Sequence, residues 1–277
     1  MTRTTLVDLP PSLSAERHDH IAVLRLSRPE KRNAIDLTMV HGIDRFFSVL
    51  PSDIRAVVIR GEGNHFCAGA DLSSINETDS SSGLLDSRAW HRAFDRIEHS
   101  DVPVVAVLHG AVIGGGLELA AAAHIRVAER GAFYALPEGS RGIFVGGGAS
   151  VRVPRLIGVP RMVDMMLTGR TYGAEEGVGL GLSQYLVEPG EGLAKALELA
   201  RRMIANAPLT NFAVIQALPR VARADPETGS LLESLMFSVA AADGEAKLRL
   251  RAFLDKRAQK VSHGDCAVTS NAEAGAG

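Results

Sequence analysis

Two glutamates, Glu118 and Glu138, stand in the sequence where their neighbours are apolar or small. Glu118 interrupts the segment 113–123, which otherwise consists of isoleucine, glycine, leucine and alanine, and Glu138 follows an Ala-Leu-Pro tripeptide. A carboxylate buried without partners is costly and titrates at a raised pKa. Two carboxylates in one partly dry site titrate apart, which supplies an acid and a base. For Glu118 alone, the simpler alternative is that it complements the dipole of a helix that begins after the glycines.

Two glycine-marked turns follow segments that have the pattern of buried strands. In the first turn Gly69 precedes Ala70, and in the second three glycines, 114–116, open the segment that carries Glu118. Free amides at a helix N-terminus attract negative charge. One amide from each turn would form a cradle for a developing oxyanion. The alternative is that each turn only provides tight backbone geometry.

Other catalytic motifs are missing from the sequence. Neither 114–116 nor 146–148 continues into a dinucleotide fingerprint or a P-loop, and no Gly-x-Ser-x-Gly elbow occurs. The nine histidines show no metal-ligand spacing, so we expect no metal. Cys67 and Tyr172 have no base at a recognisable spacing, and core or surface positions are predicted for both.

The bulk composition is that of an ordinary globular protein. The chain has 277 residues, a net charge of −2 and two cysteines. The net charge gives no indication of a nucleic-acid or membrane partner, and two cysteines are too few for a disulfide framework. The first twenty residues lack the apolar stretch of a signal peptide, and segment 102–123 contains too many glycines and polar residues for a membrane span. We expect a cytoplasmic protein.

Strand and helix patterns alternate in the first part of the chain, which predicts an α/β fold with parallel pairing. The expected strands are 21–26, 54–60, 102–108, 125–128 and 132–134, and the expected helices are 33–50, 89–98 and 114–123. Segment 73–87 is rich in serine and acidic residues and is expected to be a loop. From Ala174 onward helices are expected at 192–206, 208–224, 227–242 and 243–260. The small, polar tail 261–277 is expected to be disordered.

Several motifs in this order resemble the crotonase superfamily, whose founding activity is enoyl-CoA hydratase. The resemblance covers about 21–260 and rests on the segments 28–34 (RPEKRNA), 66–72 (FCAGADL), 103–110 (PVVAVLHG), 114–120 (GGGLELA), 137–138 (PE), 146–148 (GGG), 167–169 (LTG) and 252–257 (AFLDKR). It implies a crotonase-like spiral of ββα units in 1–190. It also implies that the helical region 191–260 builds a homotrimer, or a hexamer made from two trimers, and closes over coenzyme A.

The resemblance also implies the roles of single residues. The amides of Ala70 and Gly115 bind the thioester oxygen, while Glu118 and Glu138 hold one water over the double bond, with Glu138 handling the proton that C2 receives. No cofactor is implied, because coenzyme A is part of the acyl-CoA substrate.

Further residues are candidates for holding the substrate. Lys31 and Arg32 follow the first strand and are candidates for the CoA phosphates, with solvated loop charges as the alternative. The remaining candidates in the resembling motifs are Ala68, Asp71 and Leu72, together with Phe237 and Lys256, which match positions that close over the adenine, in an adjacent subunit. For Phe237 and Lys256 the alternatives are a core phenylalanine and a solvated lysine.

Keeping both glutamates favours an enoyl-CoA hydratase. The alternatives are an enoyl-CoA isomerase, a hydroxycinnamoyl-CoA hydratase-lyase, and a non-catalytic acyl-CoA binder. The sequence departs from the family pattern beside Glu138, at 139–141 (GSR) and 145–149 (VGGGA). These departures leave two interpretations of Arg141, an ordinary ion pair or a contact with a polar or aromatic acyl group.

Overall fold

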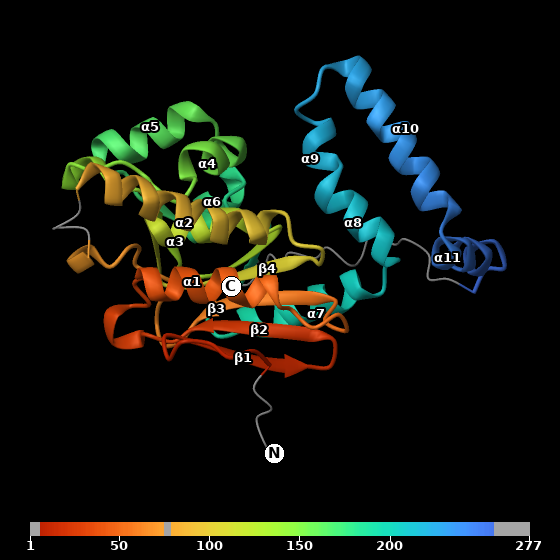
Figure 1. Ribbon diagram of the computed structural model, residues 1–277, viewed down its shortest axis with the longest axis horizontal. Coiled ribbons are helices and arrows are strands. Elements are labelled where there is room, and N and C mark those ends of the chain that lie inside the picture. The colour runs from red at the N-terminus through yellow and green to blue at the C-terminus, as the bar shows by residue number, and fades with distance from the viewer. Residues whose placement is uncertain (1–5, 75–78, 258–277) are drawn as a thin grey trace, which may run out of the picture.

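A six-stranded sheet forms the centre of the protein in a computed structural model that describes residues 6–74 and 79–257 (Figure 1). Its spatial order is β1-β2-β3-β4-β6-β9. β1 pairs antiparallel with β2, and every other neighbouring pair is parallel. The strand bounds are β1 Leu13–His18, β2 Ile21–Leu26, β3 Ala56–Gly61, β4 Val104–Leu108, β6 Ile125–Glu129 and β9 Tyr185–Val187.

Both faces of this sheet are apolar, because alternate side chains of a strand point to opposite faces. One face packs under α1 (Leu37–Ser48) and α2 (Ser80–Glu98), and it carries Ala22, Leu24, Val57, Ile59, Val104 and Ala106. The other face packs against α7 (Gly192–Ile204), and it carries Ile21, Val23, Ala56, Val58, Val105 and Val107. The sheet is therefore the middle of three layers.

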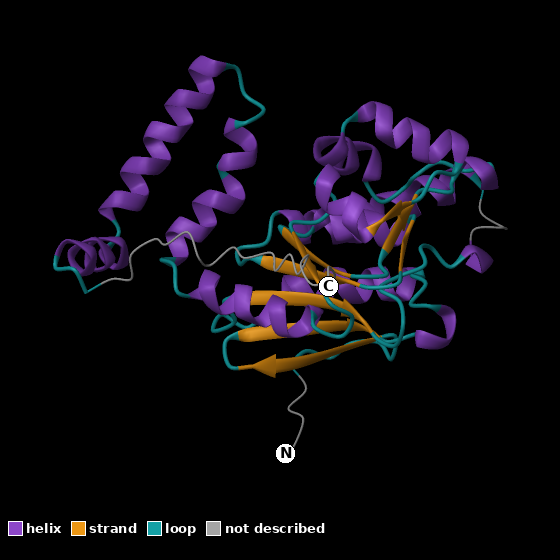
Figure 2. Cartoon of the chain, turned by 180° about the vertical axis from the view of Figure 1, so that it is seen from behind, coloured by secondary structure: helices purple, strands orange, loops and turns teal. Residues whose placement is uncertain are grey.

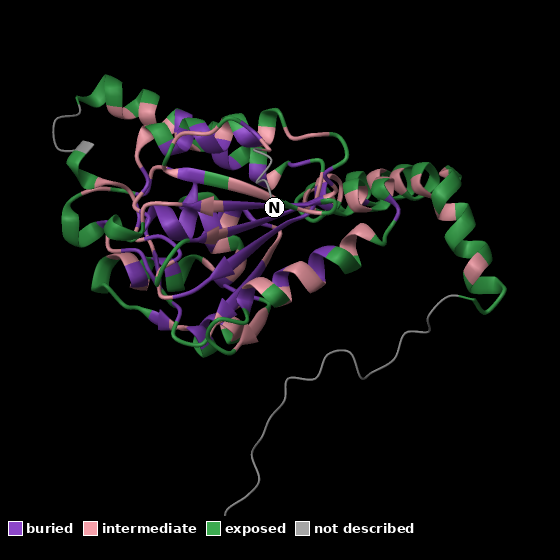
Figure 3. Ribbon diagram, turned by 90° about the horizontal axis from the view of Figure 1, so that it is seen from below, coloured by how far each residue is buried: buried purple, intermediate pink, exposed green. Residues whose placement is uncertain are grey.

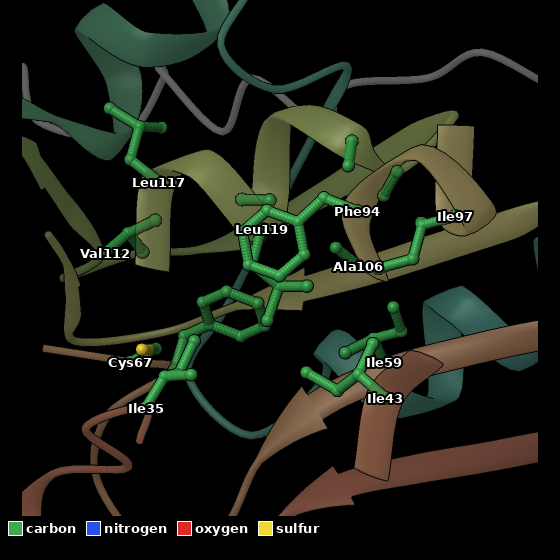
Figure 4. Packing of buried hydrophobic residues seen from close by; sticks show 14 of the residues in the cluster. Ile35, Ile43, Ile59, Cys67, Phe94, Ile97, Ala106, Val112, Leu117 and Leu119 are labelled. Atoms are coloured by element: carbon green, nitrogen blue, oxygen red, sulfur yellow. The ribbon is translucent and has the colours of Figure 1, made fainter. Parts of the chain in front are cut away.

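A smaller sheet and an apolar helix lie beside the layer that α1 and α2 form. The strands β5 (Ala111–Ile113), β7 (Phe133–Ala135) and β8 (Tyr172–Gly173) form the smaller sheet. The helix α3 (Gly115–Ala122) is buried along most of its length, and its leucines lie in one cluster with side chains of α2 and the large sheet (Figure 4). A helix that is buried on all sides has no solvated face, so its one carboxylate, Glu118, is enclosed by protein.

Short helices complete the body of the molecule. They are η1 (Pro29–Lys31), η2 (Leu72–Ser74), η3 (Gly139–Arg141), α4 (Ala149–Ile157), α5 (Val159–Thr168) and α6 (Ala174–Leu180). η2 and η3 place residues at the cleft described below.

The last four helices form an arm that projects from the body (Figures 1 and 2). They are α8 (Pro208–Gln216), α9 (Leu218–Val221), α10 (Pro226–Ala242) and α11 (Gly244–Leu254). Most of the arm is exposed, as Figure 3 shows, and its exposed side chains include Leu231, Leu235, Phe237, Val239, Leu248 and Phe253.

The α/β class, the parallel pairing and the helical C-terminal region agree with the sequence expectations. The loop expected at 73–87 is wrong from Ser80 onward, where α2 begins, because Asp79 caps this helix by accepting a hydrogen bond from Ser82 N at 2.8 Å. The helical stretch expected after Ala174 is interrupted by β9, which joins the large sheet beside β6.

The helix expected at 208–224 is divided at Ala217, two residues before a proline, Pro219, which cannot donate the helical hydrogen bond. The expected helix 243–260 ends at Leu254. Residues 258–260 and the tail 261–277 lie outside the described residues. Within the described residues, no helix has the length and apolar character needed to cross a membrane.

Candidate active site

A cleft of about 170 Å³ opens between α2 and the loops that follow the strands. Its walls combine apolar side chains with both glutamates and with backbone of the two glycine turns. The lining includes Leu37, Ala70, Leu72, Asp86, Trp90, Gly115, Glu118, Glu138, Arg141, Ile143, Phe144 and Gly147. Segments far apart in the sequence therefore meet at one concave surface.

The two glycine turns lie side by side in this cleft. Gly69 has φ of 103° and Gly114 has φ of 52°, conformations that favour glycine. A methyl group built on Gly115 would lie 3.3 Å from Ala70 N, and one built on Gly69 would lie 3.6 Å from Gly115 N. The close approach of these two turns puts the amides of Ala70 and Gly115 within reach of one small ligand group.

Neither amide has a hydrogen-bond acceptor among the described residues. The two residues that flank Ala70 form the backbone hydrogen bonds to Ile35. Ile35 N donates to Gly69 O, and Asp71 N donates to Ile35 O, both at 2.8 Å. Gly115 is the first residue of α3, where an amide has no partner within the helix. Two adjacent donors at the wall of the cleft can hold an oxygen that gains negative charge.

The Glu118 carboxylate is buried and held by backbone amides. Its Oε1 accepts hydrogen bonds from Gly147 N at 2.7 Å and from Ala149 N at 3.0 Å. Burial raises the pKa of Glu118, and these two amide bonds act in the opposite direction because they favour the charged form. Glu118 is therefore a fixed, buried carboxylate in the first turn of α3.

The Glu138 carboxylate is equally enclosed but less well satisfied. It precedes η3, and its Oε2 is buried without a hydrogen-bond partner among the described residues. Burial raises the pKa of Glu138, and the charge of Glu118 raises it further. A methyl group built on Gly114 would lie 2.7 Å from Glu138 Oε1, so this carboxylate reaches the second glycine turn. The charge of Glu118 therefore opposes the ionisation of Glu138.

The loop that holds Glu118 is itself anchored from two sides. Ser87 Oγ of α2 donates to Gly146 O at 2.7 Å, and Arg152 Nη1 of α4 donates to Gly147 O at 3.0 Å. Arg152 is buried and also donates to Glu98 Oε2 at 2.6 Å. These bonds orient the peptide units whose N–H groups point at Glu118. Sequence reasoning missed Ser87, because 73–87 was expected to be a loop.

Of the residues predicted to hold substrate, Leu72 lines the cleft, and Asp71 lies beside it in a polar cluster. The Asp71 carboxylate accepts hydrogen bonds from Ser73 Oγ at 2.7 Å, Arg28 Nη2 at 2.9 Å and Lys31 Nζ at 3.0 Å. Ser73, Lys31 and Arg28 hold the pKa of Asp71 well below its usual range. Asp71 thus fixes the loop that presents the Ala70 amide.

Three predicted residues lie close to this loop but do not line the cleft. Ala68 N donates to Arg32 O at 2.9 Å, which joins the Arg28–Asn33 segment to the first glycine turn. Lys31 and Arg32 are both exposed there, and the Lys31 ammonium is paired with Asp71. The Lys31 ammonium thus lies beside Asp71, and burial together with the charge of the exposed Arg32 lowers the pKa of His65.

Phe237 and Lys256 are not brought to the cleft of their own chain. Phe237 lies on α10 with 73% of its surface exposed, and Lys256 is an exposed residue just after α11. Helices α10 and α11 belong to the projecting arm, away from α3, which carries Glu118 (Figure 1).

Cys67 and Tyr172 are buried in the core, which is one of the two positions, core or surface, that were predicted for them. Burial raises the pKa of the Cys67 thiol to about 12, so it is not a thiolate nucleophile at neutral pH. Trp90 and Asp86 of α2 also line the cleft, and sequence reasoning missed both. Trp90 lies in the expected helix 89–98 without a chemical motif, and Asp86 lies in the segment 73–87 that was expected to be a loop.

Comparisons with known proteins show which sequences and structures this chain resembles. Residues 16–263 match the family described as Enoyl-CoA hydratase/isomerase. A short-chain-enoyl-CoA hydratase of Clostridium acetobutylicum is 31% identical over 245 residues, which cover 87% of this chain and 94% of the relative. An enoyl-CoA isomerase/hydratase, fer4, of Mycosarcoma maydis is 31% identical over 268 residues, with 93% and 97% covered. A crystal structure from Rhodopseudomonas palustris CGA009 superposes with a TM-score of 0.88 at 58% identity, covering 91% of this chain and 98% of that one.

Proposed function

The chain belongs to the enoyl-CoA hydratase/isomerase family, and we propose that it is an enoyl-CoA hydratase that adds water across the 2,3 double bond of a 2-enoyl-CoA thioester. The observation that carries this proposal is the meeting of two unpaired amides and two buried glutamates in one cleft. Its substrate is an acyl-CoA, and coenzyme A enters as part of that substrate and not as a separate cofactor.

The amides of Ala70 and Gly115 bind the thioester oxygen in this proposal. When the water oxygen attacks C3, electron density moves through C2 toward that oxygen, which acquires enolate character. Two fixed backbone donors stabilise this charge without reorganisation at the moment of reaction. Their preorganisation is supported by the Asp71 cluster on one side and by the start of α3 on the other.

The two glutamates differ in their surroundings, and this difference suggests their roles. Glu118 accepts two amide hydrogen bonds that favour its ionised form, so it acts as the acceptor that orients the water and takes its proton. Glu138 has an unpartnered oxygen beside a like charge, so it carries the proton that C2 receives. The new bonds are C3–OH and C2–H, and the bonds broken are one O–H bond of the water and the C2–C3 π bond, so the oxygen and both hydrogens of the water enter the product. The proton that Glu118 takes passes to Glu138 before the next turnover, which restores both carboxyl groups.

An isomerase that moves a double bond is the second candidate. It needs only one residue to shuttle a proton between C2 and C4, and the unpartnered Glu138 oxygen suits that task. A hydroxycinnamoyl-CoA hydratase-lyase would use the same two amides with one glutamate shuttling a proton, and a non-catalytic acyl-CoA binder would need neither carboxylate.

Turnover of the variants E118Q, E138Q and the double variant separates these functions. For a hydratase we expect each single variant to lose roughly 10²- to 10⁴-fold in hydration of crotonyl-CoA. The double variant should lose little more, because residues that act as a unit give non-additive losses. Acyl-CoA affinity should be retained. Isomerase chemistry would leave E118Q active on a 3-enoyl-CoA, and full hydration activity in E138Q would refute the hydratase proposal.

The proposal extends to assembly. We propose that the helical region 191–260 builds a homotrimer or a dimer of trimers, and that Phe237 and Lys256 close over the adenine of CoA bound to an adjacent subunit. The exposed apolar side chains of α10 support a neighbouring copy at this arm. Lys31 and Arg32 are proposed to contact the CoA phosphates. The predicted boundary near 190 remains a proposal, and α7, which follows it, packs on the large sheet.

A further inference from the structure

The cleft has a polar feature beyond Glu138 that water addition does not require. The one-turn helix η3 begins directly after Glu138 and ends at Arg141, whose N–H donates to Glu138 O at 3.1 Å. A methyl group built on Gly139 would lie 2.3 Å from Met166 O, so this turn is pressed against α5. The backbone of Arg141 is therefore held at a fixed position relative to the proposed acid.

Arg141 is the one basic residue among the described residues that line the cleft. Its guanidinium makes no hydrogen bond and no ion pair with any residue of the described part of the chain. The ordinary interpretation, an arginine paired on the surface, therefore lacks its partner. Burial raises the pKa of Glu138 and Arg141 offsets part of this increase, which places the two charges within electrostatic reach of each other.

The wall next to Arg141 is apolar. Ile143, Phe144 and Val145 follow it along the same loop and line the cleft together with Leu72. An acyl chain bound in this cleft would contact these hydrocarbon side chains, and Arg141, an exposed residue of the same lining, offers it a guanidinium. Arginine has a planar fork of donors that matches a carboxylate in a bidentate manner.

Acidic residues also line the cleft, and the positive charge of Arg141 can therefore decide whether an anionic acyl chain is accepted. Asp36 is already engaged, since it caps α1 and pairs with Arg28 at 3.0 Å. Asp86 of α2 is half-buried and makes no ion pair among the described residues. Together with the two glutamates, Asp86 makes the cleft repel an anionic acyl chain unless Arg141 compensates for that repulsion.

We propose that Arg141 binds a carboxylate at the far end of the acyl chain, so that the substrate class is a 2-enoyl-CoA whose acyl group is a dicarboxylic acid half-thioester. This proposal rests on the proposed hydratase function. It assigns Arg141 to substrate selection and leaves the chemical step to the amides and the glutamates.

Two variants with opposite expected effects test the assignment. The substrates are a six-carbon 2-enoyl-CoA that ends in a carboxylate and trans-2-hexenoyl-CoA, which has the same chain length and a methyl end. The measured quantity is the ratio of their kcat/KM values, in which effects on the shared chemical step cancel. We expect R141Q to lower the ratio by roughly 10- to 100-fold, the usual effect of losing a charged hydrogen bond. D86N should raise the ratio, because it removes a like charge from the cleft.

The outcomes separate the two proposals. If wild-type protein hydrates both substrates and R141Q leaves the ratio unchanged, the carboxylate site is refuted and the hydratase function stands. If the wild-type protein prefers the methyl-ended substrate, the assignment is likewise refuted. If neither substrate is hydrated, the proposed function fails. Calorimetric binding of the saturated forms of both thioesters then tests the site alone. Tighter binding of the carboxylated thioester that is lost in R141Q would support the site, and equal affinities for the two thioesters would refute it.

Discussion

Replacing Gly147 by alanine perturbs Glu118 without changing any charge in the cleft. A methyl group on Gly147 would lie 2.9 Å from Glu118 Oε2, 3.1 Å from its Cδ and 3.1 Å from Phe94 Cε2. Phe94 is fully buried and packs edge-to-face with Trp90 at 5.4 Å between ring centroids, so it yields little. The carboxylate or the loop must therefore move, and either movement disturbs the 2.7 Å hydrogen bond from Gly147 N.

The expected loss follows from that hydrogen bond. A hydrogen bond to a charged group contributes about 1.5–3 kcal/mol, and each 1.4 kcal/mol corresponds to about tenfold in rate. We therefore expect G147A to lower kcat for hydration of crotonyl-CoA by roughly 10- to 100-fold, with a smaller change in KM. The assay follows the loss of the conjugated enoyl-thioester absorbance.

The adjacent glycine provides a matched control. A methyl group on Gly146 would lie 3.8 Å from Ser87 Oγ, an ordinary contact, and neither glycine has a positive φ that would strain alanine. G146A should retain kcat within about twofold of wild type and should not lower the melting temperature. Equal activity of G147A and G146A, with both folded, would show that the position of Glu118 does not limit the reaction.

Four further predictions follow from the same geometry. Burial raises the pKa of Glu118 and Glu138, so the acid limb of kcat/KM should lie above the ordinary glutamate value of about 4.3, and a limb at or below that value would contradict the buried pair. E138Q should melt at a higher temperature than wild type at neutral pH. A carboxyl group whose pKa is raised in the folded state stabilises the fold below its unfolded pKa, and this stabilisation is lost as the pH rises. The difference in melting temperature between E138Q and wild type should therefore shrink in acid, where Glu138 is protonated. D71N should show the opposite pH dependence, because Ser73, Lys31 and Arg28 lower the pKa of Asp71. The ionised Asp71 carboxylate stabilises the fold above about pH 3.9, and this stabilisation is lost as the pH falls through the folded pKa. The variant should therefore be less stable than wild type at neutral pH but not in strong acid. F237A should raise KM for an acyl-CoA but not for the matching acyl-pantetheine, which lacks the adenosine, and an equal effect on both thioesters would remove Phe237 from the adenine site.

The parts of the site that could be predicted are those that one short segment encodes. The glycines of 69 and 114–116, the apolar run around Glu118 and the alternating strands all impose local backbone choices, and the structure places them as expected. These features need no information about distant residues. The same holds for the two faces of the large sheet, because its inner strands β2, β3 and β4 are apolar at most positions.

The parts that could not be predicted depend on pairs far apart in the chain. The partners of Glu118 are amides about thirty positions later, in a loop whose shape is set by Ser87 and Arg152. The first turn of α2 contains three exposed serines and a half-buried glycine, so its hydrophobic periodicity is weak and the cap at Asp79 decides where the helix begins. β1 and β9 are edge strands with only partly buried residues at most positions, and their pairing is a tertiary event.

The projecting arm has a consequence for how the protein's stability is distributed. Helices α9 and α11 contain no buried residue, α8 contains only Ile215 and α10 only Gly229. Their backbone amides are therefore protected by few tertiary contacts within the chain, whereas the amides of β3 and β4 are enclosed on both faces. In an isolated chain we therefore expect the arm to open with a local free energy below that of global unfolding, so that hydrogen exchange reports two separate cooperative units. Any partner that covers the arm raises the free energy of its opening by mass action, so the order of the arm becomes a function of protein concentration while that of the sheet does not.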